Sequence, residues 1–428
     1  MAPSAINLPQ EDQFPLKDNL SFDTCLVGSV DNHSAWTSKQ MIEEALRSRV
    51  KAIDPDTCDV GDEDPFFVAD LGEVYRQHLR WKTNLPRVKP HYAVKCNPDK
   101  QVLRLMAALG LGFDCASKNE IETVLNLGVD PSRIIYAQPC KTKSYVRYAA
   151  QSGVKQMTFD NADELYKTKQ LFPDANLYLR ILTDDSASLC RLSCKFGASL
   201  DTTAKLLELA KKLELNVVGV AFHVGSRASD PKAFQRAVQD ARFIFNQATD
   251  LGFNMHTLDV GGGFADDESF ELMAAVLSAE LDKYFPSHIR IIGEPGRYYV
   301  STAFTIACHV IARRTVNDAT LGTTSYMLHP VPHVLKNGNN VLYNVRRSGY
   351  DTPSQVEYSI WGPTCDGIDV ISKGCTFPEL LDVGDWLYFE EMGAYTKCSA
   401  TRFNGFSDSH EVVYVCSESG AAALRYIT

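Results

Sequence analysis

The stretch PHYAVKCN, residues 90–97, places Lys95 inside an apolar strand, immediately before a turn made by Asn97, Pro98 and Asp99. An ammonium group in a partly desolvated interior loses stability, so we expect a lowered pKa for Lys95 and a neutral amine that attacks carbonyl groups. Position alone does not establish this role, because most strand lysines lie at edges or keep their charged heads in water. Schiff-base chemistry at Lys95 is therefore a hypothesis that needs support from other residues.

Three other apolar runs end in polar or glycine-rich residues, as the run before Lys95 does. His223 follows the run 217–222, the glycines Gly261, Gly262 and Gly263 follow the run 258–260, and Glu294 opens the segment EPGR after the run 289–292. Segments that follow the strands of a parallel barrel build its active site. The four strand ends therefore predict one shared site.

Short apolar runs alternate with amphipathic stretches from residue 64 to about residue 314. The helices predicted from these stretches are 101–109, 118–127, 144–151, 162–172, 203–213 and 230–250, with another at 38–50. Strand–helix repetition of this extent is typical of a parallel α/β barrel. After Arg314 short β-like runs appear at 357–361, 386–389 and 411–415. The sequence predicts an α/β fold, with a parallel (β/α)8 barrel over residues 61–315 and a mainly antiparallel β domain over residues 316–428.

Composition narrows the class of protein. A length of 428 residues suggests two domains, and 45% hydrophobic with 22% charged residues is ordinary for a globular chain. A net charge of −10 without a long basic run argues against a nucleic-acid partner. No apolar stretch approaches the roughly 20 residues needed to cross a bilayer, and the start lacks the layout of a secretory signal. We expect a cytoplasmic enzyme with neither a membrane nor a nucleic-acid partner.

The twelve cysteines are scattered, and Cys96 and Cys308 lie in apolar runs where a thiol packs as a small hydrophobe. Reduced thiols are the better interpretation. Cys190 and Cys194 have the spacing of some metal ligands, but no histidine or second cysteine pair lies near them in the sequence. We therefore expect no metal site.

Five separated motifs now stand in one order along the chain, at Lys95, His223, 261–263, 294–297 and 361–367, the last reading WGPTCDG. Together they resemble the eukaryotic ornithine decarboxylase family, the barrel-type pyridoxal-phosphate decarboxylases. The resemblance runs from about residue 66 to residue 406. It implies that residues 1–60 complete the β domain, with the barrel inserted between its two parts.

Pyridoxal phosphate needs a lysine for its aldehyde, a cradle for its phosphate and a partner for its pyridine nitrogen. Lys95 supplies the first, and the three glycines let backbone N–H groups approach a phosphate closely. Glu294 is the candidate partner of the ring nitrogen; the alternative is an ion pair between Glu294 and Arg297. The resemblance implies the remaining cofactor contacts. These are Ser226, Gly296, Arg297 and Tyr395 at the phosphate, His223 stacked on the ring, and Asp114, Glu120 and Arg180 around the cofactor.

The resemblance also implies that Cys365 reaches the site from a partner subunit and governs protonation at the substrate Cα, and that Asp366 binds the distal amine of an amino-acid substrate. Both assignments imply a homodimer with shared active sites.

One segment departs from the family pattern. Family members carry a second acid in a Tyr-Asp-His-x-His segment, whereas this chain has His329 at the tyrosine position and Pro330 at the acid position. Proline has no side-chain acceptor, so half of the acid clamp for a terminal ammonium group is missing.

Three hypotheses remain open. The favoured one is a decarboxylase with altered substrate specificity, as in an alkaloid-type pathway. The second is an ordinary ornithine decarboxylase that makes putrescine for polyamine synthesis, with Asp366 alone or a shifted acid, Asp318 or Asp351, binding the amine. The third is a catalytically dead relative that binds regulatory proteins; Lys95, Glu294, Arg297 and Cys365 argue against it.

Overall fold

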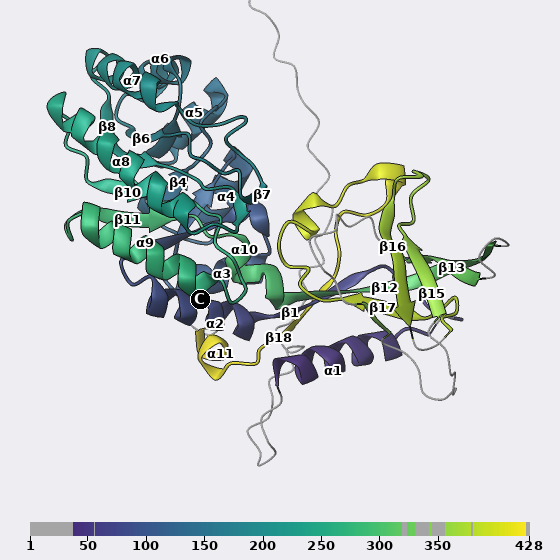
Figure 1. Cartoon of the computed structure of the whole chain (residues 1–428). Coiled ribbons are helices and arrows are strands. Elements are labelled where there is room, and N and C mark those ends of the chain that lie inside the picture. The colour runs from purple at the N-terminus through teal and green to yellow at the C-terminus, as the bar shows by residue number, and fades with distance from the viewer. Residues whose placement is uncertain are drawn as a thin grey trace, which may run out of the picture.

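The structure is a computed structural model that describes residues 37–54, 56–318, 323–330, 342–344, 356–377 and 380–424, with side chains left out between 316 and 355. Figure 1 shows two bodies side by side, a barrel ringed by helices and a β-sheet. Eight parallel strands close the barrel, in the order β10-β11-β2-β3-β4-β5-β6-β8. Their bounds are β2 Val88–Ala93, β3 Gly112–Cys115, β4 Ile134–Tyr136, β5 Gln156–Phe159, β6 Asn176–Arg180, β8 Asn216–Ala221, β10 Thr257–Asp259 and β11 Arg290–Gly293. The predicted barrel is confirmed.

Helices cover the outside of the barrel because each buries one apolar face on the strands. In α8 (Lys232–Asp250) the buried side chains recur at intervals of three or four, from Phe234 to Ala248. The other helices are α2 Leu71–Asn84, α3 Lys100–Ala108, α4 Lys118–Leu125, α5 Lys143–Gln151, α6 Ala162–Leu171, α7 Leu200–Lys212, α9 Phe270–Tyr284, α10 Arg297–Val300 and α11 Ser419–Leu424. The predicted helices of this ring are confirmed within three residues at each end. The pattern did not single out α2 and α9.

The second body is an eight-stranded sheet, mostly antiparallel, with α1 (Ser38–Lys51) packed on it. Its strands are β1 Phe66–Asp70, β12 Phe304–Asp318, β13 Thr323–Pro330, β14 Leu342–Asn344, β15 Val356–Trp361, β16 Val370–Phe377, β17 Trp386–Phe389 and β18 Val412–Val415. Residues from both ends of the chain meet here, since β1 pairs with β12 and with β18. The sheet thus takes in residues 66–70 and 304–315, which the predicted barrel range includes. The boundaries at 61 and 315 stay a prediction.

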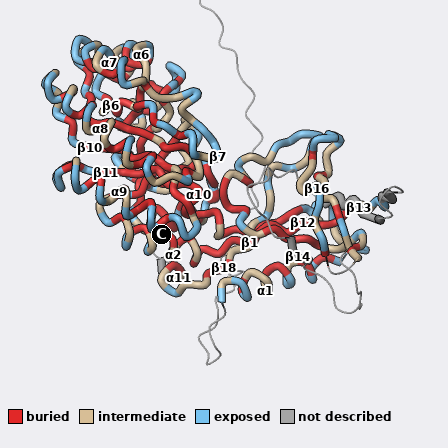
Figure 2. The backbone as a smooth tube through the Cα atoms, viewed as in Figure 1, coloured by how far each residue is buried: buried red, intermediate tan, exposed pale blue. Residues whose placement is uncertain are grey.

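Buried residues run through the barrel strands and through strands β1, β12 and β17 of the sheet (Figure 2). A two-stranded ribbon, β7 (Ser188–Cys190) with β9 (Ser226–Ala228), lies beside the barrel. Among the described residues no helix combines the length and hydropathy needed to span a bilayer. The described cysteines form no disulfide.

Candidate active site

Lys95 lies beyond the end of β2, in a single 3₁₀ turn over Val94–Cys96, and not within the strand as the sequence predicted. Three hydrogen bonds fix this turn: Tyr92 Oη donates to the carbonyl of Asn97 (2.9 Å), Asn97 Nδ2 donates to the carbonyl of Gly393 (2.9 Å), and the Tyr395 N–H donates to the carbonyl of Cys96 (2.9 Å). Two of the three come from the loop after β17. The β-sheet body therefore helps to hold the lysine at the barrel mouth.

Asp99 ties the same turn to the following helix. Its carboxylate caps α3 by accepting from the N–H groups of Gln101 and Val102, and it also accepts from Tyr414 Oη (2.8 Å) and Lys397 Nζ (3.2 Å). A capping carboxylate contributes about 1 kcal/mol to helix stability. Asp99 thus fixes the start of α3 shortly after the turn that carries Lys95.

The charge of Lys95 differs from the sequence prediction. Its Nζ forms an ion pair with Asp114, a buried residue in β3, while the lysine side chain stays 41% exposed at the open mouth. Desolvation lowers the pKa of Lys95, but Asp114, then Tyr395 and Glu294, outweigh it, so that the pKa is raised above its usual value. The expected lowering is wrong for this arrangement, because the sequence does not show that carboxyl groups surround the amine. Lys95 is an ammonium ion here.

The three glycines after β10 form a tight loop against the ends of β8 and β11. Gly261 and Gly263 have φ values of 64° and 98°, in the left-handed region that glycine tolerates. A Cβ at Gly261 would collide with the carbonyl of Phe222, and one at Gly262 would lie 2.8 Å from the carbonyl of Glu294. Only glycines fit, because a Cβ would clash at each of the three positions. The N–H of Gly261 donates to Asp259, which leaves the N–H groups of Gly262 and Gly263 as candidate donors to a ligand. This is the geometry of an anion cradle.

Glu294 and Asp259 form a buried pair of carboxyl groups at the ends of β11 and β10. Asp259 is fully buried and its Oδ1 accepts from the N–H of Gly261 (2.9 Å), while Oδ2 has no partner. Burial raises the pKa of Asp259 to about 7, and burial together with the charge of Asp259 raises the pKa of Glu294 further. The predicted alternative for Glu294 is not observed, since no ion pair joins it to Arg297, whose side chain is also described.

We expect the replacement Asp259→Asn to change how stability depends on pH. The pKa of Asp259 is 3.8 in the unfolded chain and about 7 in the folded chain. Its contribution to stability is therefore fully present below pH 3.8 and is lost as the pH rises towards about 7, because the folded state holds the proton more tightly. Asparagine can still accept from Gly261. The Tm of the cofactor-free variant minus the Tm of the cofactor-free wild type should therefore increase between pH 4 and pH 7. Asp174→Asn, at an exposed position, is the control. Parallel Tm curves would show that Asp259 is not perturbed.

His223 and Arg180 stand beside this pair. The Nδ1 of His223 accepts from the N–H of Gly225 (3.0 Å), so its proton is on Nε2. Burial, then Arg180 and Lys95, lower the pKa of His223 to about 3, which keeps the ring neutral. A neutral imidazole held by its own loop can lie flat on an aromatic ligand without the cost of a buried charge.

The barrel mouth also contains buried polar atoms without partners, and their positions fit a phosphorylated pyridine. Arg297 begins α10, is 7% exposed and leaves its Nε without a partner, and its guanidinium lies 5.2 Å from the centre of the Tyr395 ring. Glu294 Oε1 and Asp114 Oδ1 are likewise buried and unpartnered. Unsatisfied buried polar atoms are costly, so a bound group that satisfies them would be stabilised. An acidic wall for a ring nitrogen and a glycine–arginine cradle for a phosphate are what pyridoxal phosphate requires.

Five other predicted site residues have no described hydrogen bond or ion pair with Lys95, His223 or Glu294. Ser226 opens β9, and Gly296 packs against Cys96, where a Cβ would lie 2.9 Å from the Cβ of that cysteine. Glu120 accepts from the N–H of Ala116 (2.6 Å), and burial raises its pKa. Cys365 and Asp366 are exposed in the loop between β15 and β16, where Asn404 holds the Cys365 N–H (2.8 Å). Among the described contacts, none joins that loop to Lys95.

The predicted specificity segment is described by its backbone alone. His329 and Pro330 end β13, where Pro330 pairs with Val310 of β12. Asp318 ends β12, and Asp351 lies outside the described residues.

Sequence reasoning missed Asp259 as a site residue. The signal was present, because an acid two residues before a triple glycine, at the end of an apolar strand, points to the same mouth as the glycines. It also missed Asn97 and Asp99 as the residues that position Lys95.

Comparisons with known proteins agree with this geometry. The family model for the pyridoxal binding domain of pyridoxal-dependent decarboxylases matches residues 71–301. An ornithine decarboxylase of Neurospora crassa is 61% identical over 425 residues, covering 90% of this chain and 88% of that protein. Decarboxylase flvG of Aspergillus flavus is 45% identical, covering 84% and 87%. The crystal structure of the arginine decarboxylase of Paramecium bursaria Chlorella virus bound to agmatine matches with a TM-score of 0.80 at 34% identity, covering 87% of this chain and 100% of that one.

Proposed function

This chain belongs to the ornithine decarboxylase family of pyridoxal-dependent decarboxylases, and on that premise we propose that it decarboxylates an ornithine-like amino acid whose distal nitrogen is substituted, cyclic or differently placed. The observation that carries the proposal is Pro330, which stands where the family has the second acid for a terminal ammonium group. The products would be carbon dioxide and an amine.

The residues around the barrel mouth divide the work. When bound, pyridoxal phosphate supplies an electron sink for the electrons left behind as carbon dioxide departs. Lys95 provides the amine to which the cofactor attaches, and Asp114 keeps that amine in place by its ion pair. Glu294 holds a proton for the ring nitrogen, and Asp259 tunes the affinity of Glu294 for that proton. The glycine loop and Arg297 offer N–H donors to a phosphate.

The second candidate is an ordinary ornithine decarboxylase that makes putrescine. The 61% identity to the Neurospora crassa enzyme favours it. The change at Pro330 favours the first candidate instead.

A panel of amino acids tests the two candidates. A hydrogen bond to a charged group contributes about 1.5–3 kcal/mol, so its loss should lower kcat/KM for ornithine roughly ten- to a hundred-fold relative to a substrate with a secondary, tertiary or ring nitrogen. Pro330→Asp should raise activity on ornithine and lower it on the bulkier substrate. If the wild-type protein turns over ornithine as well as any other amino acid tried, the ordinary enzyme is the answer.

We also propose a cytoplasmic homodimer in which each site takes Cys365 and Asp366 from the partner chain. The exposed position of their loop, with no described contact to Lys95 of its own chain, supports this. In such a dimer, the barrel of one subunit would hold the cofactor, and the loop of the partner subunit would complete the site.

Cys365→Ala should still bind pyridoxal phosphate but release aldehyde alongside the amine. Without proton delivery to the substrate Cα, the proton would add to the cofactor carbon instead, so that hydrolysis would release an aldehyde and leave the amino group on the cofactor as pyridoxamine phosphate. The measurement is the ratio of aldehyde to amine. Mixed with Lys95→Ala subunits, this variant should regain some clean amine production if sites are shared. Proven heterodimers without any recovery would contradict sharing, and an unchanged product ratio would show that Cys365 is structural.

A further inference from the structure

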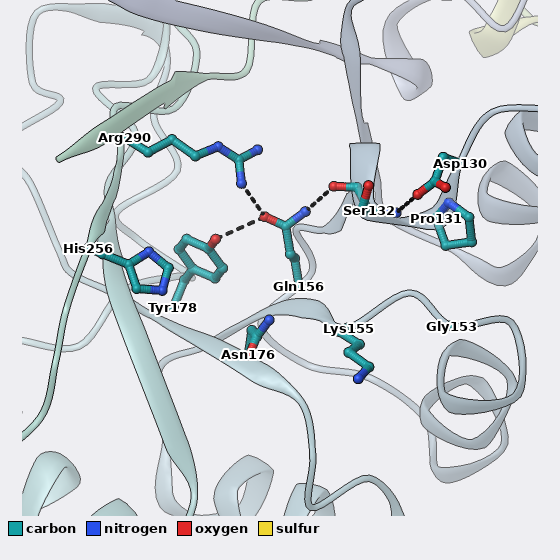
Figure 3. Close-up of a pocket in the computed structure, with 10 residues that line it drawn as sticks. All are labelled: Asp130, Pro131, Ser132, Gly153, Lys155, Gln156, Asn176, Tyr178, His256 and Arg290. Carbon is teal, nitrogen blue, oxygen red and sulfur yellow. Dashed lines mark hydrogen bonds between the residues drawn. The ribbon is translucent and has the colours of Figure 1, made fainter. Parts of the chain in front are cut away.

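A cavity of about 470 Å³, whose lining residues are drawn in Figure 3, lies at the end of the barrel where the strands begin. Gln156, Asn176 and Arg290, which line it, are the first residues of β5, β6 and β11, and His256 directly precedes β10. Lys95 and Glu294 follow the last residues of their strands. The cavity and the candidate active site therefore occupy the two opposite mouths of one barrel, and the proposed decarboxylation does not use this one.

A polar network lines the inner wall of the cavity, and in it the charged Arg290 is bonded to neutral partners. Gln156 is 6% exposed, and its Oε1 accepts both from Tyr178 Oη (2.9 Å) and from Arg290 Nη1 (3.2 Å). Its Nε2 donates to the carbonyl of Ser132 (2.7 Å). Figure 3 shows these bonds converging on Gln156, with the guanidinium of Arg290 pointing towards that amide. The amide thus fixes the orientation of the arginine without neutralising its charge.

The second partner of Arg290 is also neutral. Arg290 Nη2 lies 3.3 Å from Nε2 of His91, whose Nδ1 faces the carbonyl of Lys89 (3.3 Å). Burial, then Arg290, lower the pKa of His91 to about 3, so His91 accepts from the guanidinium and cannot repel it as a cation. Gly112 leaves room for the ring, because a Cβ there would collide with it. Within the described part of the chain, no carboxylate pairs with Arg290.

Positive charge exceeds negative charge around this mouth. Lys155 lines the cavity without an ion pair among the described residues. Burial, then Arg290 and Arg133, lower the pKa of nearby Lys89, as expected where cations crowd one another. Asp130 is the one acid in the lining, and its carboxylate accepts from the N–H of Ser132 (2.8 Å). The mouth is therefore a basic recess with fixed donors and too few acceptors.

We propose that this mouth of the barrel binds a phosphate group, held by Arg290 and Lys155. A guanidinium has five N–H groups, of which those of Arg290 that donate to Gln156 and His91 are two, and the others can donate to the oxygen atoms of a phosphate. A second cation beside it favours a dianion over a carboxylate. The volume is large enough for a small phosphorylated metabolite as well as for the free ion. Free phosphate and the phosphate of a metabolite are the two sources to be separated.

The test measures anion binding to the protein loaded with pyridoxal phosphate, so that the glycine cradle is occupied. Titration calorimetry at constant ionic strength, with inorganic phosphate and with adenosine 5′-monophosphate, should give one site per chain with a Kd of roughly 1 mM or tighter. Tighter binding of the nucleotide identifies a phosphorylated metabolite as the ligand. Equal or weaker binding of the nucleotide identifies the free ion.

Variants assign the site. Arg290→Gln should weaken binding at least about ten-fold and Lys155→Met several-fold, whereas Asp130→Asn should strengthen it, because it removes the one lining acid. Lys51→Met, at the exposed end of α1, is the matched control and should bind as the wild type does. Decarboxylation at saturating substrate should not change in any of them. If Arg290→Gln fails to fold, the exposed pair Lys155→Met and Asp130→Asn decides. No binding, or binding that ignores these two changes, overturns the proposal.

Discussion

Replacement of Lys95 by alanine should remove the attachment of pyridoxal phosphate and lower kcat/KM by roughly a thousand-fold or more, the scale seen when an enzyme loses its nucleophile. Lys95 is the amine that projects into the barrel mouth between Asp114 and Glu294. Lys95→Arg is the more informative variant, since it keeps the ion pair with Asp114 but has no primary amine. Both variants should be equally inactive if attachment is the role of Lys95.

Borohydride reduction followed by peptide mapping gives a readout that does not depend on turnover. The pyridoxyl group should appear on the peptide that contains Lys95. Lys141 is an internal control, because its Nζ is buried, pairs with Glu164 and donates to the carbonyl of Thr158 (2.7 Å). Exposed Lys100→Ala should leave the labelling unchanged. A label on any other lysine would defeat the assignment.

The barrel and its site could be predicted because their signals are local. Strand and helix periods are written in consecutive residues, and parallel strands bring their ends to one mouth, so Lys95, His223, Gly262 and Glu294 converge as expected. Lys95, His223 and Glu294 also lie within two residues of the ends of their strands. These features required no knowledge of which strand neighbours which.

The charge of Lys95 could not be predicted, because it depends on distances across the barrel. Asp114 reaches the amine from the adjacent strand β3, and pairing of strands is a property of the closed barrel. The pairing of Asp259 with Glu294 has the same origin, since β10 and β11 are neighbours in the barrel.

Helices α2 and α9 were not predicted from the hydrophobic pattern. In α2 the reason is visible, because its buried polar residues Gln77 and His78 interrupt the apolar stripe.

Glu294→Gln should lower kcat/KM roughly ten- to a hundred-fold while Lys95 is still labelled by reduction. The carboxyl group can share a proton with a ring nitrogen, whereas the amide cannot, and a hydrogen bond to a charged group contributes about 1.5–3 kcal/mol. The surroundings favour a protonated ring nitrogen, because Asp114 and Asp259 place two further carboxyl groups against the same space. Glutamine preserves the volume, so packing should be maintained.

Asp259→Asn separates this electrostatic role from a structural one. The charge of Asp259 raises the pKa of Glu294, so its removal should lower that pKa and shift the acid limb of the kcat profile to lower pH. In Glu294→Gln the same limb should lose its dependence on this group. The absorbance of the bound cofactor, followed over the same pH range, provides a second readout. A Glu294→Gln enzyme within two-fold of the wild-type rate, with an unchanged cofactor spectrum, would mean that another group holds the ring nitrogen and that the acidic pair only supports the barrel mouth.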